Sequence, residues 1–211
     1  MSNSKRGGLC RIIGAGEFSP SDITDFCDAF YIAADGGLEK LDALGLEPSL
    51  TVGDFDSLGY TPSGQNVSVF PSEKDDTDTG IAVKRAIALG FDTIELYGAL
   101  GGRLDHTLAN IQLLSLISES GRRGRIIGNG VIITAVTDSS LEFPAGTRGT
   151  VSVFALGGIA HGVYLTGLKY PLVNATLTCD FPLGVSNEFT GAASKITVEH
   201  GTLTVITLNG E

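Results

Sequence analysis

The feature that most constrains the fold is an alternation of strand-like and helix-like segments, which runs through about the first 128 residues and then stops. Apolar runs such as Leu9–Ile13 and Phe30–Ala34 end in glycine-containing turns, and apolar residues at helical spacing follow them. The pattern predicts further strands at 50–52, 67–70 and 93–97, and helices over 21–29, 38–44, 77–89 and 104–120. Such an alternation favours a mainly parallel sheet covered by helices, as in a three-layer α/β domain.

From Gly128-Asn129-Gly130 onward, the pattern changes to short strands separated by glycine, proline and asparagine. The expected strands are 131–136, 150–155, 163–168, 175–178, 195–199 and 202–208. Glu199-His200-Gly201 is predicted to be the turn of a hairpin between the last two of them. We therefore expect an α/β domain over residues 1–128, followed by a β-sandwich or jelly-roll-like domain over residues 129–211.

The charge balance and the cysteine pattern narrow the setting in which the protein works. Fourteen Lys and Arg against 24 Asp and Glu give a formal net charge of −10, which argues against non-specific binding of nucleic acid. The sequence has no run of 18 apolar residues, so we expect no membrane span. Its three cysteines are scattered and form no CxxC motif, which favours a reducing compartment. We therefore expect a cytoplasmic protein.

Acidic residues gather in three clusters, each near the end of a predicted strand or the start of a predicted helix. The clusters are Gly53-Asp54-Phe55-Asp56-Ser57, Lys74-Asp75-Asp76-Thr77-Asp78 and Gly101-Gly102-Arg103-Leu104-Asp105-His106. Ligands of open parallel sheets bind at the carboxyl ends of the strands, so we expect the clusters to share one site. Carboxylate oxygens suit Mg²⁺, and Lys74 and Arg103 could hold phosphate oxygens. The sequence thus predicts a magnesium-dependent phosphoryl-transfer site.

Each cluster also has a simpler structural explanation. Asp56 and Ser57 could cap a turn, and Thr77 or Asp78 could cap a helix. His106 could be an ordinary residue of a first helical turn, and Asn110, one turn later, could hydrogen-bond only locally. The functional interpretation is favoured because the clusters occur together in one half of one predicted sheet.

In their combined order, these motifs resemble those of the thiamine pyrophosphokinase family. The matching segments of the first half are Ala34-Asp35-Gly36-Gly37, the three acidic clusters, Gly98 and Asn110. Those of the second half are Gly167-Leu168-Lys169-Tyr170-Pro171-Leu172 and Gly184-Val185-Ser186-Asn187-Glu188. The resemblance implies an α/β domain followed by a β-sandwich, and a homodimer with active sites between its subunits. It also implies transfer of pyrophosphate from ATP to the hydroxyl of thiamine, with release of AMP.

The resemblance further implies roles for individual residues. Three aspartates would bind Mg²⁺: Asp54, Asp56 and Asp78. The nucleotide and its phosphates would be bound by Asp35, Gly36, Lys74, Arg103 and His106. Catalysis would involve Asp75, Asp78, Arg103 and Asp105, with either Asp75 or Asp105 orienting or deprotonating the thiamine hydroxyl. Thiamine would be contacted by Ser186 and Asn187, and by an aromatic residue that must be Phe or Tyr because the chain has no Trp; the candidates are Tyr170 and Phe189.

Two other interpretations stay open at this point. One is a different magnesium-dependent phosphotransferase or phosphohydrolase. Phosphohydrolases that form an aspartyl-phosphate also carry an Asp-x-Asp motif at a strand end, but theirs usually opens the domain's first strand and is followed by Thr. Here Asp54 and Asp56 follow the third predicted strand and precede Ser57. The other is a non-catalytic sensor of thiamine or nucleotide on the same fold, against which the intact acids and Arg103 argue.

Overall fold

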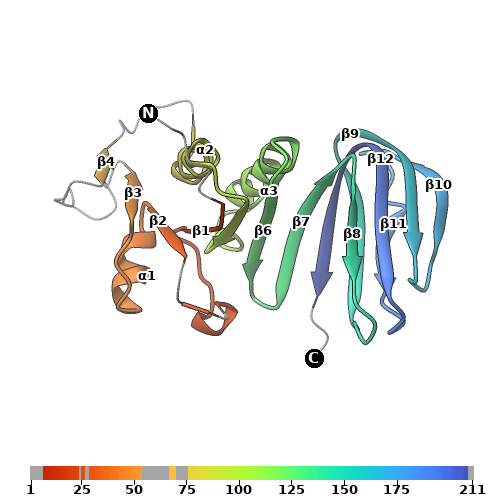
Figure 1. Ribbon diagram of the computed structural model, residues 1–211, viewed down its shortest axis with the longest axis horizontal. Coiled ribbons are helices and arrows are strands. Elements are labelled where there is room, and N and C mark those ends of the chain that lie inside the picture. Colours follow the sequence, from red (N-terminus) through yellow and green to blue (C-terminus); the bar gives the residue numbers. More distant parts are fainter. Residues whose placement is uncertain (1–6, 24, 27–28, 54–66, 70–75, 209–211) are drawn as a thin grey trace. The chain divides into compact units, whose positions relative to one another are not determined.

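A computed structural model describes residues 7–23, 25–26, 29–53, 67–69 and 76–208, with only the backbone described for residues 67–69 (Figure 1). The chain divides into two compact units. The first comprises Met1–Leu113 and Gly124–Asn129, and the second comprises Leu114–Arg123 and Gly130–Glu211. The chain passes from the first unit to the second for the last time at Asn129 and Gly130, whose φ angles of 56° and 73° suit a tight turn.

The strands of the first unit run mainly parallel to one another. They are β1 (Leu9–Ile13), β2 (Phe30–Ala34), β3 (Leu50–Gly53), β4 (Val67–Val69), β5 (Thr93–Tyr97) and β6 (Arg123–Gly128), and their spatial order is β6-β5-β1-β2-β3-β4. In this order β1 is parallel to β2 and to β5, and β3 is parallel to β2 and to β4. The parallel arrangement predicted from the alternating pattern is therefore confirmed for these strands.

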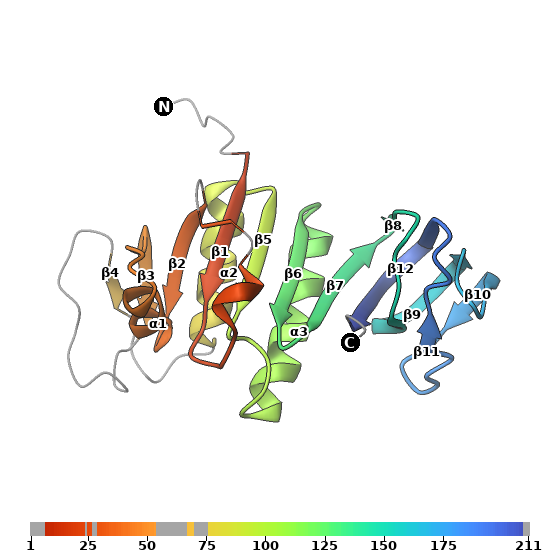
Figure 2. The same ribbon diagram turned by 90° about the horizontal axis from the view of Figure 1, so that it is seen from below.

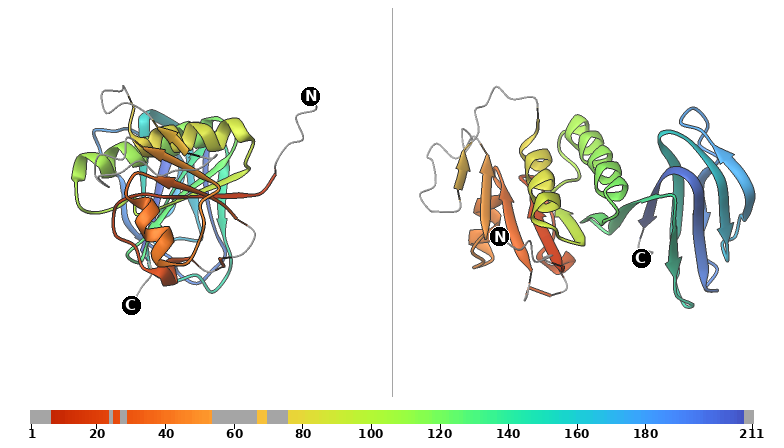
Figure 3. Two further views of the ribbon diagram at one scale, coloured as in Figure 1. Left: turned by 90° about the vertical axis from the view of Figure 1, so that its left-hand side faces the viewer. Right: turned by 45° about the horizontal axis from the view of Figure 1, so that its top comes forward.

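The central strands of this sheet are buried on both faces. On one face, strand residues form a hydrophobic cluster with Leu38 and Leu41 of α1 (Gly37–Ala43). Those strand residues are Ile13, Tyr31, Ala33 and Tyr97. Helix α2 (Asp78–Leu89) packs on β1, β2 and β3 and buries Ala82, Val83 and Ala86. Figures 2 and 3 show that α1 and α2 lie on different sides of the strands.

Two helical segments of the first unit show how local sequence sets helix ends. Helix α2 begins as predicted, since the hydroxyl of the N-cap residue Thr77 accepts a hydrogen bond from Gly80 N at 3.0 Å, and it ends at Gly90 with a φ of 85°. The helix predicted for residues 21–29 was wrong. The described residues there form a single 3-10 turn, Pro20–Asp22. Ser19 and Asp22 cap each other across this turn, so they stabilise the turn and not the start of a longer helix.

The second unit consists mainly of antiparallel strands. These are β7 (Val131–Thr137), β8 (Ser140–Phe143), β9 (Thr150–Thr166), β10 (Leu172–Leu177), β11 (Gly184–Glu188) and β12 (Ser194–Leu208). The first part of β12 pairs with β8 and its last part pairs with β7, while β9 runs beside both parts. Likewise, the first part of β9 pairs with β11 and its last part pairs with β10. The strands thus form two groups. In one, β8 and β10 flank the first part of β12 and the last part of β9; in the other, β7 and β11 flank the last part of β12 and the first part of β9. Both groups contribute residues to one hydrophobic cluster.

The long strands β9 and β12 correct the predicted hairpin. Glu199-His200-Gly201 is not a turn, because β12 continues through it and only the register with β9 shifts between His200 and Thr202. Gly201 has a φ of 104°, and a Cβ there would lie 2.6 Å from Ile159 O. Glycine therefore lets the strand bend without losing its partner, and the predicted strands 195–199 and 202–208 are one element.

The remaining helix, α3 (Leu104–Glu119), begins in the first unit after the loop that follows β5. Within the described part of the chain, no helix is both long enough and apolar enough to cross a membrane.

Candidate functional site

The carboxyl ends of the parallel strands are tied together by main-chain hydrogen bonds. Gly14 N, just after β1, donates to Tyr97 O of β5 at 2.8 Å, and Gly16 N donates to Gly98 O at 2.9 Å. Asp35 N, just after β2, donates to Val52 O of β3 at 2.9 Å. These bonds join the strand ends in two pairs, β1 with β5 and β2 with β3, at the edge where ligands of parallel sheets bind.

Glycines permit the close backbone approach at this edge. Gly98 has a φ of 62°, and a Cβ on it would lie 2.6 Å from both Gly14 O and Gly16 O. Gly37, at the start of α1, would bring a Cβ within 1.8 Å of Ile13 O. No side chain fits at either position, so Gly98 and Gly37 hold the loop after β5 and the start of α1 against β1.

Asp35 and Gly36, both predicted to bind the nucleotide, lie at this edge between β2 and α1. Asp35 adopts a φ of 50°, which is uncommon for a residue with a side chain, and its carbonyl accepts a hydrogen bond from Leu38 N at 3.3 Å. Gly36 is the N-cap of α1 and contributes no side-chain cap. Backbone amides at a helix start, next to a carboxylate, form a polar surface where the sequence predicts one.

The start of α2 places Asp78 in the first helical turn, while neighbouring side chains build the cap. Thr77 supplies the N-cap oxygen. Asp76 Oδ1 accepts a hydrogen bond from Thr77 N at 3.0 Å. Asp76 Oδ2 forms an ion pair with Lys84 Nζ at 2.6 Å. Helix capping thus explains the presence of Thr77, and Asp76 is held by Thr77 N and Lys84. The N-cap residue is Thr77 and not Asp78.

The loop after β5 brings Arg103, Asp105 and His106 together at the start of α3. Arg103 binds Asp105 through two parallel hydrogen bonds, from Nε to Oδ1 at 3.1 Å and from Nη2 to Oδ2 at 2.6 Å. His106 N also donates to Asp105 Oδ1, at 3.0 Å. The side chains of Arg103 and Asp105 are 72% and 64% exposed, so solvent or a ligand can reach both.

The pairing changes the acidity of both groups. The hydrogen bond from Arg103 lowers the pKa of Asp105 to about 2, and the same contact raises the pKa of Arg103. Both groups are therefore ionised across the neutral range. Asp105 is a weak base while Arg103 holds it, since a carboxylate with so low a pKa has little affinity for a proton.

Asn110, on α3, holds the same loop through a buried hydrogen bond to its backbone. Its side chain is 6% exposed, and its Nδ2 donates to Ala99 O at 2.9 Å. The contact reaches back 11 residues to the loop after β5, so the local hydrogen bond considered from the sequence is not what this structure contains. Asn110 thereby links the backbone near Gly98 to the helix that begins at Arg103.

In the second unit, Ser186 and Asn187 have different surroundings. Ser186 is exposed, has a φ of 56°, and its backbone N donates to Ser152 Oγ at 3.0 Å. Asn187 is only 3% exposed, and its carboxamide hydrogen-bonds both main-chain groups of Tyr170. Of the two aromatic candidates, Tyr170 is 56% exposed, whereas Phe189 is 6% exposed and packs against Phe143 with ring centroids 4.8 Å apart.

Four of the predicted site residues lie outside the described residues: Asp54, Asp56, Lys74 and Asp75. Of the three proposed magnesium ligands, Asp78 alone is described. Among the described residues, no group of three or more His, Cys, Asp or Glu side chains is placed to hold a metal ion.

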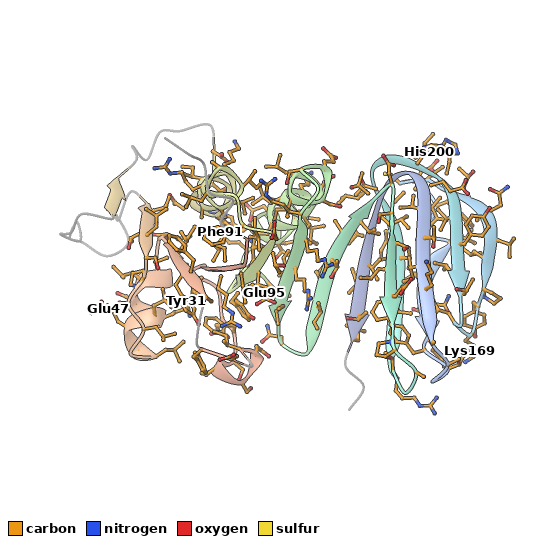
Figure 4. The ribbon with its side chains drawn as sticks, viewed as in Figure 1. Tyr31, Glu47, Phe91, Glu95, Lys169 and His200 are labelled. Carbon is orange, nitrogen blue, oxygen red and sulfur yellow. The ribbon has the colours of Figure 1, made fainter. Side chains whose placement is uncertain are left out.

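A buried polar network in the first unit was not foreseen. Arg11 of β1 binds Glu95 of β5, with Nε and Oε2 3.3 Å apart, and its Nη1 donates to Tyr31 OH at 3.0 Å and to Asp25 O. Tyr97 OH donates to Glu95 at 3.0 Å. Figure 4 labels Tyr31 on β2 and Glu95 on β5, the two strands that flank β1. The signal in the sequence was a charged residue inside each of two otherwise apolar strands.

Comparison with known protein families matches both halves of the chain. The model described as "Thiamin pyrophosphokinase, catalytic domain" matches residues 27–123, and that described as "Thiamin pyrophosphokinase, vitamin B1 binding domain" matches residues 139–203. These two ranges hold all of the predicted site residues, and the second range contains both second-half segments of the resemblance, 167–172 and 184–188.

Individual relatives agree with the family models. Thiamine pyrophosphokinase of Bacillus subtilis (strain 168) is 30% identical over 195 residues, which cover 88% of this chain and 91% of the relative. The crystal structure of thiamine pyrophosphokinase from Bacillus subtilis has a TM-score of 0.83 at 27% identity, covering 97% of this chain and 100% of that one. The thiamin pyrophosphokinase structure from Geobacillus thermodenitrificans has a TM-score of 0.81 at 27% identity, with 97% and 99% covered. The chain therefore belongs to the thiamine pyrophosphokinase family.

Proposed function

We propose that this thiamine pyrophosphokinase carries out its reaction at the carboxyl edge of β1, β2, β3 and β5, with residues of the second unit binding thiamine. The reaction, ATP-dependent transfer of pyrophosphate to the hydroxyl of thiamine, follows from membership of the family. The observation that carries the proposal is the match of both family models, in order, to the two halves of the chain.

The same match supports a proposed domain assignment. We assign nucleotide and metal binding to a three-layer α/β domain over residues 1–128, and thiamine binding to a β-sandwich over residues 129–211. The parallel strands of the first unit and the paired groups of antiparallel strands in the second support this assignment. A cytoplasmic location remains a prediction from composition.

The proposed ligands of Mg²⁺ are Asp54, Asp56 and Asp78. Their carboxylates are hard oxygen ligands of the kind that Mg²⁺ binds together with phosphates. Asp78 supports the assignment by its position, because it stands in the first turn of α2 while Thr77 supplies the cap. When bound, Mg²⁺ would neutralise part of the charge on the phosphates.

Other residues of the first unit would bind and orient ATP. Lys74 and Arg103 are proposed to contact phosphate oxygens, and Asp35, Gly36 and His106 to contact the nucleotide. Arg103 is suited to this because its guanidinium, at the start of a 16-residue helix, is exposed and already holds one oxyanion group in a bidentate manner. A phosphate of ATP would then take the place of the Asp105 carboxylate on the Arg103 guanidinium.

The general base is proposed to be Asp75 or Asp105. Without ATP, Arg103 holds Asp105 and lowers its pKa, which makes this carboxylate a weak base. A phosphate that replaced Asp105 on Arg103 would release the carboxylate, so we assign to Asp105 the role of keeping Arg103 in place before ATP binds, and the orientation or deprotonation of the thiamine hydroxyl to either Asp75 or Asp105. The hydroxyl would attack the β-phosphorus, and AMP would leave.

The thiamine side is proposed to come from a second copy of the chain. Ser186 and Asn187 lie in the second unit, whereas the acids lie in the first, and a homodimer with sites between subunits accommodates both. Mixing Asp54→Asn subunits with Asn187→Ala subunits should then regenerate some complete sites, so that activity at a thiamine concentration well below the KM exceeds the mean of the two separate variants. Failure to recover activity, with subunit exchange verified by mass, would place each site within one chain.

The decisive assay is incubation of the purified protein with ATP, Mg²⁺ and thiamine. The expected products are AMP and thiamine diphosphate in equal amounts. ADP with a monophosphate ester, or phosphate release without a thiamine product, would instead indicate another phosphotransferase or a phosphohydrolase. Thiamine binding without any product would indicate a sensor.

A further inference from the structure

The exposed ring of Tyr170 is held in place by a structure that we call the clasp, the pairing of residues 167–170 with residues 186–190 in the second unit. Leu168 pairs with Phe189 in an isolated antiparallel bridge, and Lys169 N donates to Glu188 O at 3.0 Å. Gly167 O accepts hydrogen bonds from Thr190 Oγ1 and Ser194 Oγ at 2.9 and 3.0 Å. The clasp is thus closed at its base by backbone and hydroxyl contacts.

Asn187 is the centre of the clasp. Its Oδ1 accepts from Tyr170 N at 3.0 Å and from Glu188 N at 2.9 Å, and its Nδ2 donates to Tyr170 O at 2.7 Å. A carboxamide has two acceptor sites and two N–H donors, so three of these four are already used. Since the residue is also only 3% exposed, it has little left to offer a substrate directly.

The backbone before Asn187 explains why this side chain points inward. The register of β11 on β9 shifts between Gly184 and Asn187, which inserts an extra residue. Ser186 occupies the bulge with a φ of 56°. The bulge turns the Asn187 side chain toward the backbone of Tyr170. There the carboxamide hydrogen-bonds the N–H and the C=O of Tyr170, as the backbone of a neighbouring strand would.

Tyr170 combines an exposed ring with a fixed backbone. The residue is 56% exposed, although both its backbone N and its backbone O are held by Asn187. Lys169 Nζ lies 5.4 Å from the centre of the Tyr170 ring and 2.7 Å from Glu188 Oε1, so the ring is flanked by an ion pair (Figure 4 labels Lys169). A large aromatic surface is therefore exposed to solvent on a backbone with little freedom to move.

We propose that Asn187 is a positioning residue, which fixes the backbone of Tyr170 so that the ring of Tyr170 forms the flat surface on which the pyrimidine ring of thiamine stacks. The inference rests on the proposed function and deepens it, because it separates the residue that touches thiamine from the residue that holds it. Stacking a planar heterocycle on an exposed aromatic side chain contributes measurably to binding and needs a ring of fixed orientation.

The test compares the affinity for thiamine of Asn187→Ala, Tyr170→Ala and the double variant, measured by calorimetry in the presence of Mg²⁺ and a non-hydrolysable ATP analogue. Each single change should weaken thiamine binding about tenfold, a typical effect of losing one stacked aromatic group. In the double variant, binding should be within about twofold of the weaker single variant, because Asn187 acts only through Tyr170. Effects that multiply in the double variant would overturn the proposal.

Two further measurements separate positioning from general stability. In steady-state assays, Asn187→Ala should raise the KM for thiamine and leave the KM for ATP and the kcat within about twofold, whereas a purely structural role would change all three. Phe181→Ala is the matched control, since it removes another exposed ring, 64% accessible, from outside the clasp. A tenfold loss of thiamine affinity in this control would also overturn the proposal.

Asn187→Asp keeps the test decisive if Asn187→Ala does not fold. A carboxylate retains the acceptor for Tyr170 N and Glu188 N, but its second oxygen replaces the donor to Tyr170 O and repels that carbonyl. Thiamine affinity should fall, and the fall should disappear when Tyr170 is Ala. Unchanged affinity in folded Asn187→Asp contradicts the proposal. Wild-type protein that binds thiamine but forms no AMP would refute the proposed reaction and still allow these comparisons, whereas absence of thiamine binding would refute both.

Discussion

Two arginine–carboxylate pairs in the first unit use the same groups in opposite surroundings. Arg11 and Glu95 meet at 3.3 Å in the middle of the sheet, with side chains 5% and 11% exposed. Arg103 and Asp105 meet at 2.6 Å at the start of α3, with side chains 72% and 64% exposed. Because the chemistry is the same, burial decides what each pair can do.

The buried pair belongs to a network whose members satisfy one another. Arg11 also donates to Tyr31 OH and Asp25 O, and Glu95 also accepts from Tyr97 OH. Burial raises the pKa of Tyr97, with Glu95 adding to the effect, so the phenol keeps the proton that it donates. Exchanging any partner for a ligand would leave a buried charge uncompensated, which makes this pair structural. The exposed pair can exchange partners at small cost.

The largest effect is expected for Arg11→Met. Removing the cation leaves Glu95 buried without its partner, and we expect the free energy of unfolding to fall by about 3–5 kcal/mol. The measurement is urea unfolding followed by circular dichroism. Arg103→Met is the matched control, and it should change the unfolding free energy by less than about 1 kcal/mol. Similar losses in both variants would show that burial does not distinguish the two pairs.

The opposite pattern is expected for acids at the carboxyl edge. Asp78→Asn should lower turnover at least about 100-fold while the unfolding free energy stays nearly constant, because the carboxylate is proposed to hold the metal and not the fold. Asp54→Asn should behave in the same way. Asp92→Asn is the matched control, since it makes the same change in an exposed residue just before β5, at the other edge of the sheet. Near-normal turnover of Asp78→Asn would remove this residue from the metal site.

A smaller effect is expected for Arg103→Lys, which keeps the charge of the exposed pair. A guanidinium binds a phosphate through two parallel hydrogen bonds, and an ammonium cannot reproduce them, so we expect kcat/KM for ATP to fall at least about tenfold. Arg85→Lys, at an exposed arginine on α2, should leave kcat/KM unchanged. If the two variants have the same kinetics, Arg103 serves only to begin α3.

The sequence predicted those parts of the fold whose signals are local. Helix α2 was predicted because Thr77 and Gly90 are strong start and stop signals, and the strands of the parallel sheet because apolar runs end in glycine. Strand β6 was missed because two arginines and a glycine occupy the first half of Arg123–Gly128. Strands β8 and β11 were missed because Ser140–Phe143 and Gly184–Glu188 are short and polar. The bend at Gly201 was mistaken for a turn because glycine has the same local preference in both.

The site divides along the same line. Arg103 and Asp105 are two residues apart, so the sequence could place them in one cluster, but it did not predict that they pair. Asn110 and Asn187 bind main-chain atoms 11 and 17 residues away, and a backbone partner leaves no residue-specific signal at that distance. The sequence could therefore name Asn187 as a residue of the thiamine side, but it could not show that its carboxamide faces Tyr170.

The smallest expected effect is the pH dependence of the stability that the exposed pair of Arg103 and Asp105 contributes. The pKa of Asp105 is lowered by Arg103 to about 2, below the value of about 3.9 for an unfolded chain. A carboxylate with a lowered pKa stabilises the fold above its unfolded pKa and loses that contribution as the pH falls toward its folded pKa. The melting temperatures of wild type and Asp105→Asn should therefore differ by a small constant amount above about pH 5 and converge between about pH 4 and pH 2. Because both side chains face solvent, 1 M salt should reduce the difference, whereas the large loss in Arg11→Met should persist in salt. A difference between wild type and Asp105→Asn that grows on acidification would mean that the pairing with Arg103 is not what sets the acidity of this carboxylate.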